Sequence, residues 1–268
     1  WRAMAYSSDP AAQRGFVPPQ NDQERLVMRR VQDLCGIAMR KGIARYSSFL
    51  SDREQTLAQA ALNRESCEEY SFDGGYPFAE RKILCIEPVG SCGTPPIACV
   101  QVECFHAQDV PAHKDYLGAV LGLGLDRSSI GDIVPDPQAP GTAYVFALEP
   151  AAELLCNELA SVGRYSVHTQ RFYGEIPVQE PERTRQSATV SSLRADAVLA
   201  AMLRCSRGQA ADLVRGGRLE INHVAVSNPH APVYQGDLFT VRGNGRFRLE
   251  EIGGKSKKDR QFITFFQY

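Results

Sequence analysis

The fold of the C-terminal part of the chain can be predicted from residues 191–222, which read SSLRADAVLAAMLRCSRGQAADLVRGGRLEIN. Apolar residues recur at helical spacing over residues 196–204, which predicts a first short helix. A second helix is expected to begin at Ser206, because Ser206 and Gln209 have the spacing of a capping box, and to end at Gly216. From Leu219 onward apolar and polar residues alternate, so a small β-sheet should follow the two helices.

Basic side chains are frequent in and after this stretch, outside its apolar stripes. Guanidinium groups form bidentate hydrogen bonds with phosphate, and a helix N-terminus adds backbone donors and a favourable dipole. We therefore predict contacts with a nucleic-acid backbone. The candidates around the two helices are Arg194, Arg204, Ser206, Arg207, Arg215 and Arg218. The candidates further along the chain, which would extend the same track, are Arg242, Arg246, Lys255, Lys257, Lys258 and Arg260.

Charge is divided unevenly along the chain, although the net charge is only −1. Residues 191–268 hold 12 Lys plus Arg against 7 Asp plus Glu, a balance of +5, which leaves 18 against 24, or −6, for the remainder. A basic C-terminal part suits a polyanionic partner, since Lys and Arg contacts with phosphate supply most sequence-independent affinity. Ordinary scatter of surface charge explains a balance of +5 equally well, so the prediction depends on the positions of the arginines.

Length and composition restrict the class of protein. A chain of 268 residues with 43% hydrophobic residues is long enough for two or three modules with ordinary cores. No run of about 18 apolar residues is present, so we expect no membrane span. The eight cysteines include no close Cys-x-x-Cys pair and the five histidines have no metal-ligand spacing. This pattern favours reduced thiols and neither a metal nor another cofactor.

Composition and periodicity divide the whole chain into five segments. Residues 1–20 lack periodicity and read as a flexible leader, while residues 21–64 predict an N-terminal helical segment of two capped helices. Residues 65–173 show, after an initial strand, the order β-α-β-β-α-β, which predicts a central ferredoxin-like α/β plait that binds RNA. Residues 174–190, with several Pro and Glu, are expected to be a linker to the C-terminal module, residues 191–268. The predicted fold class is α+β.

Two aromatic residues of the predicted plait are candidates for base stacking. Tyr144 and Phe146 are two residues apart on one expected strand, so their rings should lie on the same face of the sheet. RNA-recognition modules with this architecture stack bases on such rings. Aromatic residues of a sheet more commonly belong to the core, so packing under the helices of the plait is the alternative.

The ordered motifs of the C-terminal part resemble the RNA-binding domain first described in the fourth small-subunit ribosomal protein, here called the S-four domain. These motifs are Arg194-Ala-Asp196, Ser206-Arg207 with Ala210, GRLEIN at 217–222, and Gly236-Asp237. The ending narrows the resemblance to the YlmH-like proteins, through RGNGRF at 242–247 and KKDR at 257–260. Four upstream segments are also similar to that family: FDGGY at 72–76, AER at 79–81, HKDYLGAVLGLG at 113–124 and IGD at 130–132.

Three residues depart from the family's pattern. Ala195 stands where leucine is usual, His223 where the turn is usually Asn-Gly, and Asn244 where lysine is common. The first two are expected to affect packing and turn strain, and the third removes one phosphate contact.

The resemblance implies a function as well as a fold. YlmH-like proteins associate with the large ribosomal subunit, handle stalled nascent chains attached to tRNA, and are linked to cell division in some bacteria. The chain is therefore expected to bind rRNA, tRNA or both, as a monomer and without catalysis, in the bacterial cytoplasm or a plastid stroma. The alternatives are a cell-division-linked protein adaptor with incidental RNA contact, and an RNA-modifying enzyme with an unrecognised catalytic domain. RNase sensitivity of its complexes would separate the RNA-binding reading from the adaptor, whose complexes should survive RNase treatment.

Overall fold

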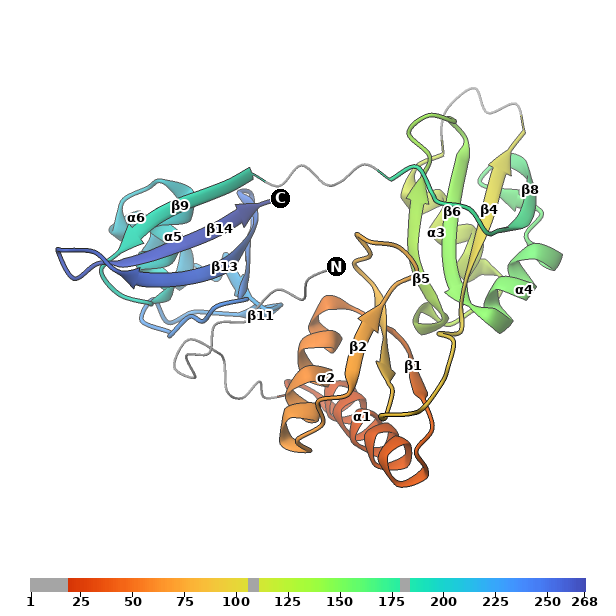
Figure 1. Cartoon of the computed structure of the whole chain (residues 1–268). Coiled ribbons are helices and arrows are strands. Elements are labelled where there is room, and N and C mark those ends of the chain that lie inside the picture. The colour runs from red at the N-terminus through yellow and green to blue at the C-terminus, as the bar shows by residue number, and fades with distance from the viewer. Residues whose placement is uncertain (1–18, 106–110, 179–183) are drawn as a thin grey trace. The chain divides into compact units, whose positions relative to one another are not determined.

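The computed structural model of the chain describes residues 19–105, 111–178 and 184–268 (Figure 1). These residues form two compact units, which we call the front unit (19–178) and the C-terminal unit (184–268). Nearly all of the predicted leader, residues 1–20, lies outside the described residues. None of the helices in the described ranges is long and apolar enough to cross a membrane.

The front unit begins with two helices and a small sheet rather than with helices alone. Its elements are α1 (Asp22–Lys41), β1 (Arg45–Leu50), α2 (Asp52–Arg64), β2 (Tyr70–Asp73) and β3 (Lys82–Ile86). The strands form an antiparallel sheet in the order β1-β3-β2. Both helices predicted for residues 21–64 are present, but the strand β1 between them was not predicted. Only the last two residues of β1 are buried, so its sequence lacks the alternation that reveals a strand.

The second part of the front unit is a plait. Its elements are β4 (Ile97–Cys104), α3 (His113–Gly122), η2 (Arg127–Ser129), β5 (Ile130–Pro135), β6 (Thr142–Leu148), α4 (Glu149–Glu158), β7 (Ser161–Val162) and β8 (Tyr165–Phe172). The sheet order β5-β6-β4-β8-β7 with antiparallel neighbours is that of a ferredoxin-like plait extended by the short β7. Its topology confirms the predicted β-α-β-β-α-β order, although β2 and β3, placed in the plait by the predicted range 65–173, belong to the preceding sheet.

The two faces of the plait sheet are covered by different elements. One face packs against α3 and α4 through residues such as Val100, Val145 and Leu155. The opposite face packs against the preceding sheet, where Phe49 and Ile83 meet side chains of β6. The plait therefore lies between its own helices and the first part of the front unit.

The C-terminal unit contains two helices and a sheet larger than the sequence predicts. Its elements are β9 (Thr184–Val190), α5 (Ala195–Leu203), α6 (Arg207–Arg215), β10 (Leu219–Ile221), β11 (Val224–Ala225), β12 (Leu238–Val241), β13 (Gly245–Lys255) and β14 (Gln261–Gln267). The sheet order is β11-β10-β12-β13-β14-β9. Strand β9 lies within the predicted linker, so that linker is shorter than 174–190. The basic end of the predicted C-terminal module forms the β13–β14 hairpin.

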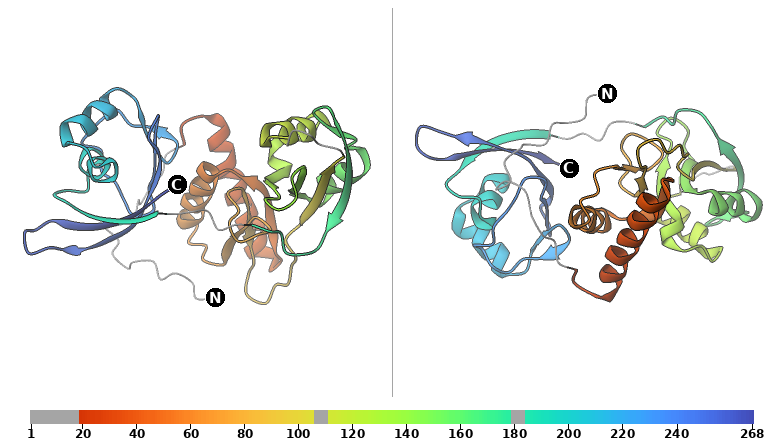
Figure 2. Two further views of the ribbon diagram at one scale, coloured as in Figure 1. Left: turned by 90° about the horizontal axis from the view of Figure 1, so that it is seen from above. Right: turned by 60° about the horizontal axis from the view of Figure 1, so that its bottom comes forward.

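The helices α5 and α6 lie on one side of this sheet, as the two views in Figure 2 show. Val198 and Val214 from the helices share a core with the inward rings of Phe239, Phe247 and Phe265. The sheet thus has an inner face toward the helices and an outer face away from them.

The turn between β10 and β11 explains one of the family motifs. Asn222 and His223 both have positive φ angles, +51° and +64°. A tight hairpin turn requires this conformation, which is energetically unfavourable for residues other than glycine. The Asn222 side chain donates to Asp237 Oδ1 at 2.8 Å and accepts from the Leu238 amide at 2.9 Å. Asn222 thereby ties this turn to the start of β12, and His223 carries the expected turn strain.

Candidate nucleic-acid interface

A buried carboxylate holds two of the predicted arginines together. Asp196, in the first turn of α5, has only 4% of its surface exposed. Arg194, the N-cap of α5, donates to it through Nε at 3.2 Å and Nη2 at 3.0 Å. Arg207, the first residue of α6, donates through Nε at 2.9 Å and Nη2 at 3.4 Å. His230 Nδ1 lies 4.0 Å from the same carboxylate. We call these four residues the Asp196 cluster.

The electrostatics of the Asp196 cluster leave a net positive charge at the surface. Burial by itself would raise the pKa of Asp196, but the hydrogen bonds and charges of Arg207 and Arg194 outweigh it and hold the pKa below its usual value. Two guanidinium groups and one carboxylate leave a charge of about +1. The Arg194 and Arg207 side chains are 34% and 47% exposed, so each is fixed on one side by Asp196 and open to solvent on the other.

Ser206 has a structural role that limits its predicted contact with phosphate. Its hydroxyl accepts from the Gln209 amide at 3.2 Å, and its own amide donates to Gln209 Oε1 at 3.0 Å. This arrangement confirms the predicted capping box of α6. The Ser206 amide donates to Gln209 and so is not a free donor in this structure, while contact of Ser206 with RNA stays a prediction.

A second cationic site consists of Arg218 and Arg242, which we call the arginine pair. The strands place them side by side, since Leu219 pairs with Val241 and the Arg242 amide donates to the Arg218 carbonyl at 3.0 Å. Both side chains are exposed, and neither forms an ion pair with any described residue. Like charges on opposed strand positions weaken a sheet, so this pair is better explained by an anionic partner than by stability.

The other predicted cations have different surroundings. Arg215 forms an exposed ion pair with Asp212 at 3.0 Å. Arg204 donates to Gln186 Oε1 on β9 at 3.0 Å, which holds a strand to the end of α5. Since α6 has nine residues and is about 13 Å long, the Asp196 cluster and Arg215 lie near opposite ends of it.

The remaining predicted cations lie on the β13–β14 hairpin. Lys255 pairs with Asp259 at 2.8 Å, and Arg260 donates to Thr189 Oγ1 at 3.1 Å. The side chains of Arg246, Lys257 and Lys258 are exposed. The predicted cations thus fall into three local groups, the Asp196 cluster, the arginine pair and the hairpin.

The predicted stacking residues of the plait are part of its core. Tyr144 is 5% exposed and Phe146 is 3% exposed, because the preceding sheet covers this face of the plait. The Tyr76 ring stacks on Phe146 with ring centroids 4.8 Å apart, and Phe172 contacts Tyr144 at the same separation. Neither ring can stack on a base in this structure. Both rings are buried, as the alternative predicted, but the preceding sheet covers them and not the helices of the plait.

Asp132 joins the two parts of the front unit, a role that the sequence does not reveal. It accepts hydrogen bonds from the Tyr76 hydroxyl at 2.9 Å, the Glu80 amide at 2.6 Å and the Arg81 amide at 3.1 Å. The Arg81 guanidinium in turn donates to the Ile130 carbonyl at 3.0 Å. The motifs at 72–76, 79–81 and 130–132 thus contact one another through Asp132. Sequence spacing alone does not reveal contacts between motifs so far apart in the chain.

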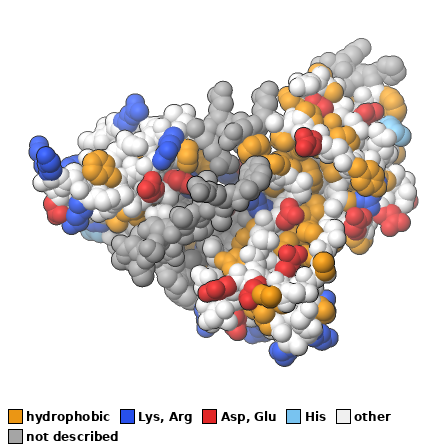
Figure 3. Space-filling model, in the orientation of Figure 1, with side chains coloured by type: hydrophobic (Ala, Val, Ile, Leu, Met, Phe, Trp, Pro, Cys, Tyr) orange, Lys and Arg blue, Asp and Glu red, His pale blue; other side chains and the backbone are white. Residues whose placement is uncertain are grey.

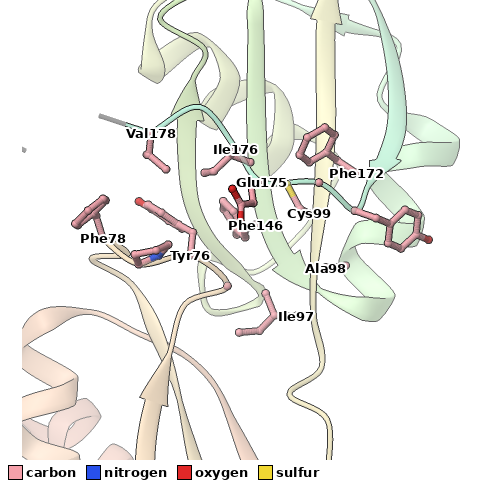
Figure 4. A pocket seen from close by; sticks show the side chains of 14 residues that line it. Tyr76, Phe78, Ile97, Ala98, Cys99, Phe146, Phe172, Glu175, Ile176 and Val178 are labelled. Atoms are coloured by element: carbon pink, nitrogen blue, oxygen red, sulfur yellow. The ribbon is translucent and has the colours of Figure 1, made fainter. Parts of the chain in front are cut away.

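A cavity of about 540 Å³ lies beside this joint (Figure 4). Its walls include the rings of Tyr76, Phe146 and Phe172, together with Cys99. Glu175 is the single charged residue among the described residues that line it. An apolar cavity with one carboxylate does not suit phosphate. The described residues also contain no group of three or more His, Cys, Asp or Glu placed to hold a metal ion.

Comparisons with known proteins match families to both the plait and the C-terminal unit. A family described as "Putative RNA-binding domain in YlmH" matches residues 108–175, and the "S4 domain" family, our S-four domain, matches residues 193–239. The chain is similar to "Ribosome-associated protein quality control protein P2" of Bacillus subtilis (strain 168), with 32% identity over 225 residues, 82% of this chain and 85% of the relative.

A solved structure, "Cell division protein ylmH from Streptococcus pneumoniae", is similar in fold. Its TM-score is 0.50 at 14% identity, and the match covers 59% of this chain and 96% of that one. The identity and coverage of the Bacillus relative, together with the two domain families, show that the chain belongs to the YlmH family and carries an S-four RNA-binding domain at its C-terminal end.

Proposed function

We propose that this protein is a non-catalytic factor that associates with the large ribosomal subunit and contacts rRNA, tRNA or both through its S-four domain. The Bacillus relative is named as a ribosome-associated quality control protein, which supports a role in handling stalled nascent chains in the bacterial cytoplasm. We propose that it acts there as a monomer. Both matched domain families are described by RNA binding or by the S-four fold, which favours binding over catalysis.

The Asp196 cluster is the observation that carries the proposal. Ordering a long basic side chain normally costs conformational entropy when it binds. Asp196 orders the guanidinium groups of Arg194 and Arg207 before any partner arrives, and it does so without covering them. Two fixed planar donors suit the bidentate geometry of phosphate oxygens.

The expected mode of recognition follows from this geometry. Guanidinium contacts with phosphate carry no base information. A-form RNA hides base edges in its deep major groove, so structured RNA is recognised mainly by its shape and backbone. The Asp196 cluster and the arginine pair would thus select a folded RNA by the spacing of its phosphates.

The test measures binding of the purified full chain to isolated large ribosomal subunits at increasing salt. The informative variant is the Arg218→Glu, Arg242→Glu double variant, because both side chains are exposed and neither pairs with a described residue. The matched control is the Arg29→Glu, Arg30→Glu double variant, which makes the same charge change on exposed positions of α1. Loss of two charge-assisted contacts, worth about 1.5–3 kcal/mol each, should weaken binding by about 100-fold or more, whereas the control should bind normally.

Charge reversal at Arg207 would be a poorer test. It would place a second carboxylate beside the buried Asp196 and so destabilise the helices themselves. Arg207→Gln keeps a donor near Asp196 and is the better variant for this position. Unchanged affinity and unchanged salt dependence in the Arg218→Glu, Arg242→Glu variant would contradict the proposal.

A further inference from the structure

The outer face of the C-terminal sheet carries a row of aromatic side chains on β14. Ile263 and Phe265 point inward and are about 1% exposed, so the alternate residues point outward. Among these, Phe262 is 48% exposed, Tyr268, directly after the strand, is 44% exposed, and Phe266 is half-buried. We call Phe262, Phe266 and Tyr268 the aromatic row. The aromatic row lies on the face of the sheet opposite to α5 and α6, so it is separate from the Asp196 cluster between these helices.

Arginines flank the aromatic row on both neighbouring strands. Phe266 pairs with Arg185 on β9 and with Arg248 on β13. The Tyr268 amide donates to the Arg246 carbonyl at 3.1 Å, which places Arg246 beside it on β13. Neighbouring strands are about 4.8 Å apart, so the Phe266 and Tyr268 rings each lie next to an arginine side chain.

The same pattern continues at the other end of the strand. Phe262 pairs with Thr189 of β9, and the Arg260 guanidinium donates to the Thr189 hydroxyl at 3.1 Å. The acidic residues on β13 are Glu250 and Glu251, and Glu251 lies 3.9 Å from Arg185, with both of these side chains largely exposed. Figure 3 shows Lys and Arg side chains together with a few acidic ones near hydrophobic side chains on the visible part of the C-terminal unit.

We propose that the aromatic row and its flanking arginines bind a single-stranded segment of RNA. Every nucleobase has a π-face that stacks on an aromatic ring, and arginines beside the rings follow the backbone, which is the usual construction of single-strand sites. A protein partner could also contact the rings, but four arginines against two glutamates, Glu250 and Glu251, favour a polyanion. The proposal deepens the proposed function, on which it rests for RNA as the partner, by adding a second contact for unpaired nucleotides.

The first experiment uses the full chain and two fluorescent RNAs, an unstructured 12-nucleotide strand and a stable hairpin. The Phe262→Ala, Tyr268→Ala double variant should bind the single strand about 100-fold more weakly, about tenfold for each lost ring, with an unchanged salt slope. Its affinity for the hairpin should change by less than about twofold, because hairpin binding is assigned to the helix side. The Phe262→Tyr, Tyr268→Phe variant keeps both rings and should bind like the wild type.

The second experiment separates the arginines from the rings. The Arg185→Gln, Arg246→Gln double variant should lower the salt slope for the single strand by about 1.4, because each phosphate contact to a single strand contributes about 0.7. For the alanine variant of the first experiment, the control is Leu26→Ala, which also truncates an exposed apolar side chain, since Leu26 is 44% exposed on α1. It should change neither affinity nor slope.

Two results would overturn the inference. One is a wild-type protein that does not bind the unstructured strand, and the other is an alanine double variant that binds it as well as the wild type does. The second result would leave a protein partner as the explanation of the rings. Failure of the proposed function looks different: the Arg218→Glu, Arg242→Glu variant would then bind large subunits normally, whatever the aromatic row does.

Discussion

Asp196 determines where two arginines point, and this explains why an acidic residue occurs inside a basic surface. Its carboxylate is buried between α5 and α6 and accepts four hydrogen bonds from Arg194 and Arg207. Removal of a buried partner leaves two guanidinium groups without a counter-charge. Asp196 therefore contributes both to stability and to the geometry of the proposed RNA contact.

Asp196→Asn should destabilise the C-terminal unit by about 2 kcal/mol at pH 7, because hydrogen bonds to charged groups are worth about 1.5–3 kcal/mol. The pKa of Asp196 is lowered in the folded state, so its contribution is complete above the unfolded value of about 3.9 and disappears as the pH falls through the folded value. The measurement is hydrogen exchange of α5 and α6 amides from pH 7 to pH 2. The gap between wild type and variant should narrow toward pH 2.

The control for this prediction is Asp212→Asn on α6. Asp212 is 77% exposed and its ion pair with Arg215 is on the surface, so its loss should change the free energy of unfolding by less than about 0.5 kcal/mol. A wild-type to Asp196→Asn difference that stays constant down to pH 2 would contradict the role assigned to the ionised carboxylate.

Asp132→Ala should destabilise the front unit by about 2–4 kcal/mol, since it removes the acceptor of a tyrosine hydroxyl and two backbone amides. Tyr76→Phe removes one of these donors and should cost about 1 kcal/mol. Urea unfolding of both variants checks the order. A loss for Asp132→Ala no greater than that for Tyr76→Phe would show that the amide bonds contribute nothing.

At the scale of secondary-structure elements, local signals account for what the sequence predicts well. The capping boxes at Ser51 and Ser206 begin α2 and α6 as expected, since a cap depends on neighbours three residues away. The plait order follows from strong alternation and helical periodicity. Only the strand-like end of β9, Ala188-Thr-Val190, could be recognised from the sequence, because TRQSATV is largely polar and the strand is defined by pairing with β14, about 80 residues further on.

The β13–β14 hairpin should contribute to RNA affinity through charge alone. The Lys257→Gln, Lys258→Gln double variant should lower the salt slope for structured RNA by about 1.8, because each phosphate contact to a duplex contributes about 0.9. Both residues are exposed, so the free energy of unfolding should not change. Binding titrations over a range of salt concentrations measure this slope, and a slope equal to that of the wild type would exclude the hairpin tip from the interface.

At the scale of the whole molecule, charge and structure divide the chain in a similar way. The segment 191–268 carries a balance of +5 and contains the Asp196 cluster, the arginine pair and the hairpin, while the remainder carries −6. Composition thus indicated the same end of the chain as the candidate interface. It could not show which arginines meet, because the partners of Asp196 come from two helices and a loop.

In the plait, by contrast, the sequence pointed to residues that are buried. Its aromatic residues matched a known mode of base stacking, yet the sheet formed by β1, β2 and β3 covers them. Sequence periodicity shows that a residue lies on a sheet face but does not show what covers that face. The candidate stacking rings lie instead on β14, in a segment where only the charges had drawn attention.

The most direct test of the central claim is crosslinking in cells, followed by sequencing of the RNA recovered with this protein. If the S-four arginines bind ribosomal RNA, large-subunit rRNA and tRNA should be enriched with the wild type and the Arg29→Glu, Arg30→Glu control, and lost with the Arg218→Glu, Arg242→Glu variant. Equal recovery with that variant, or complexes that survive RNase treatment intact, would contradict the account and favour a protein adaptor.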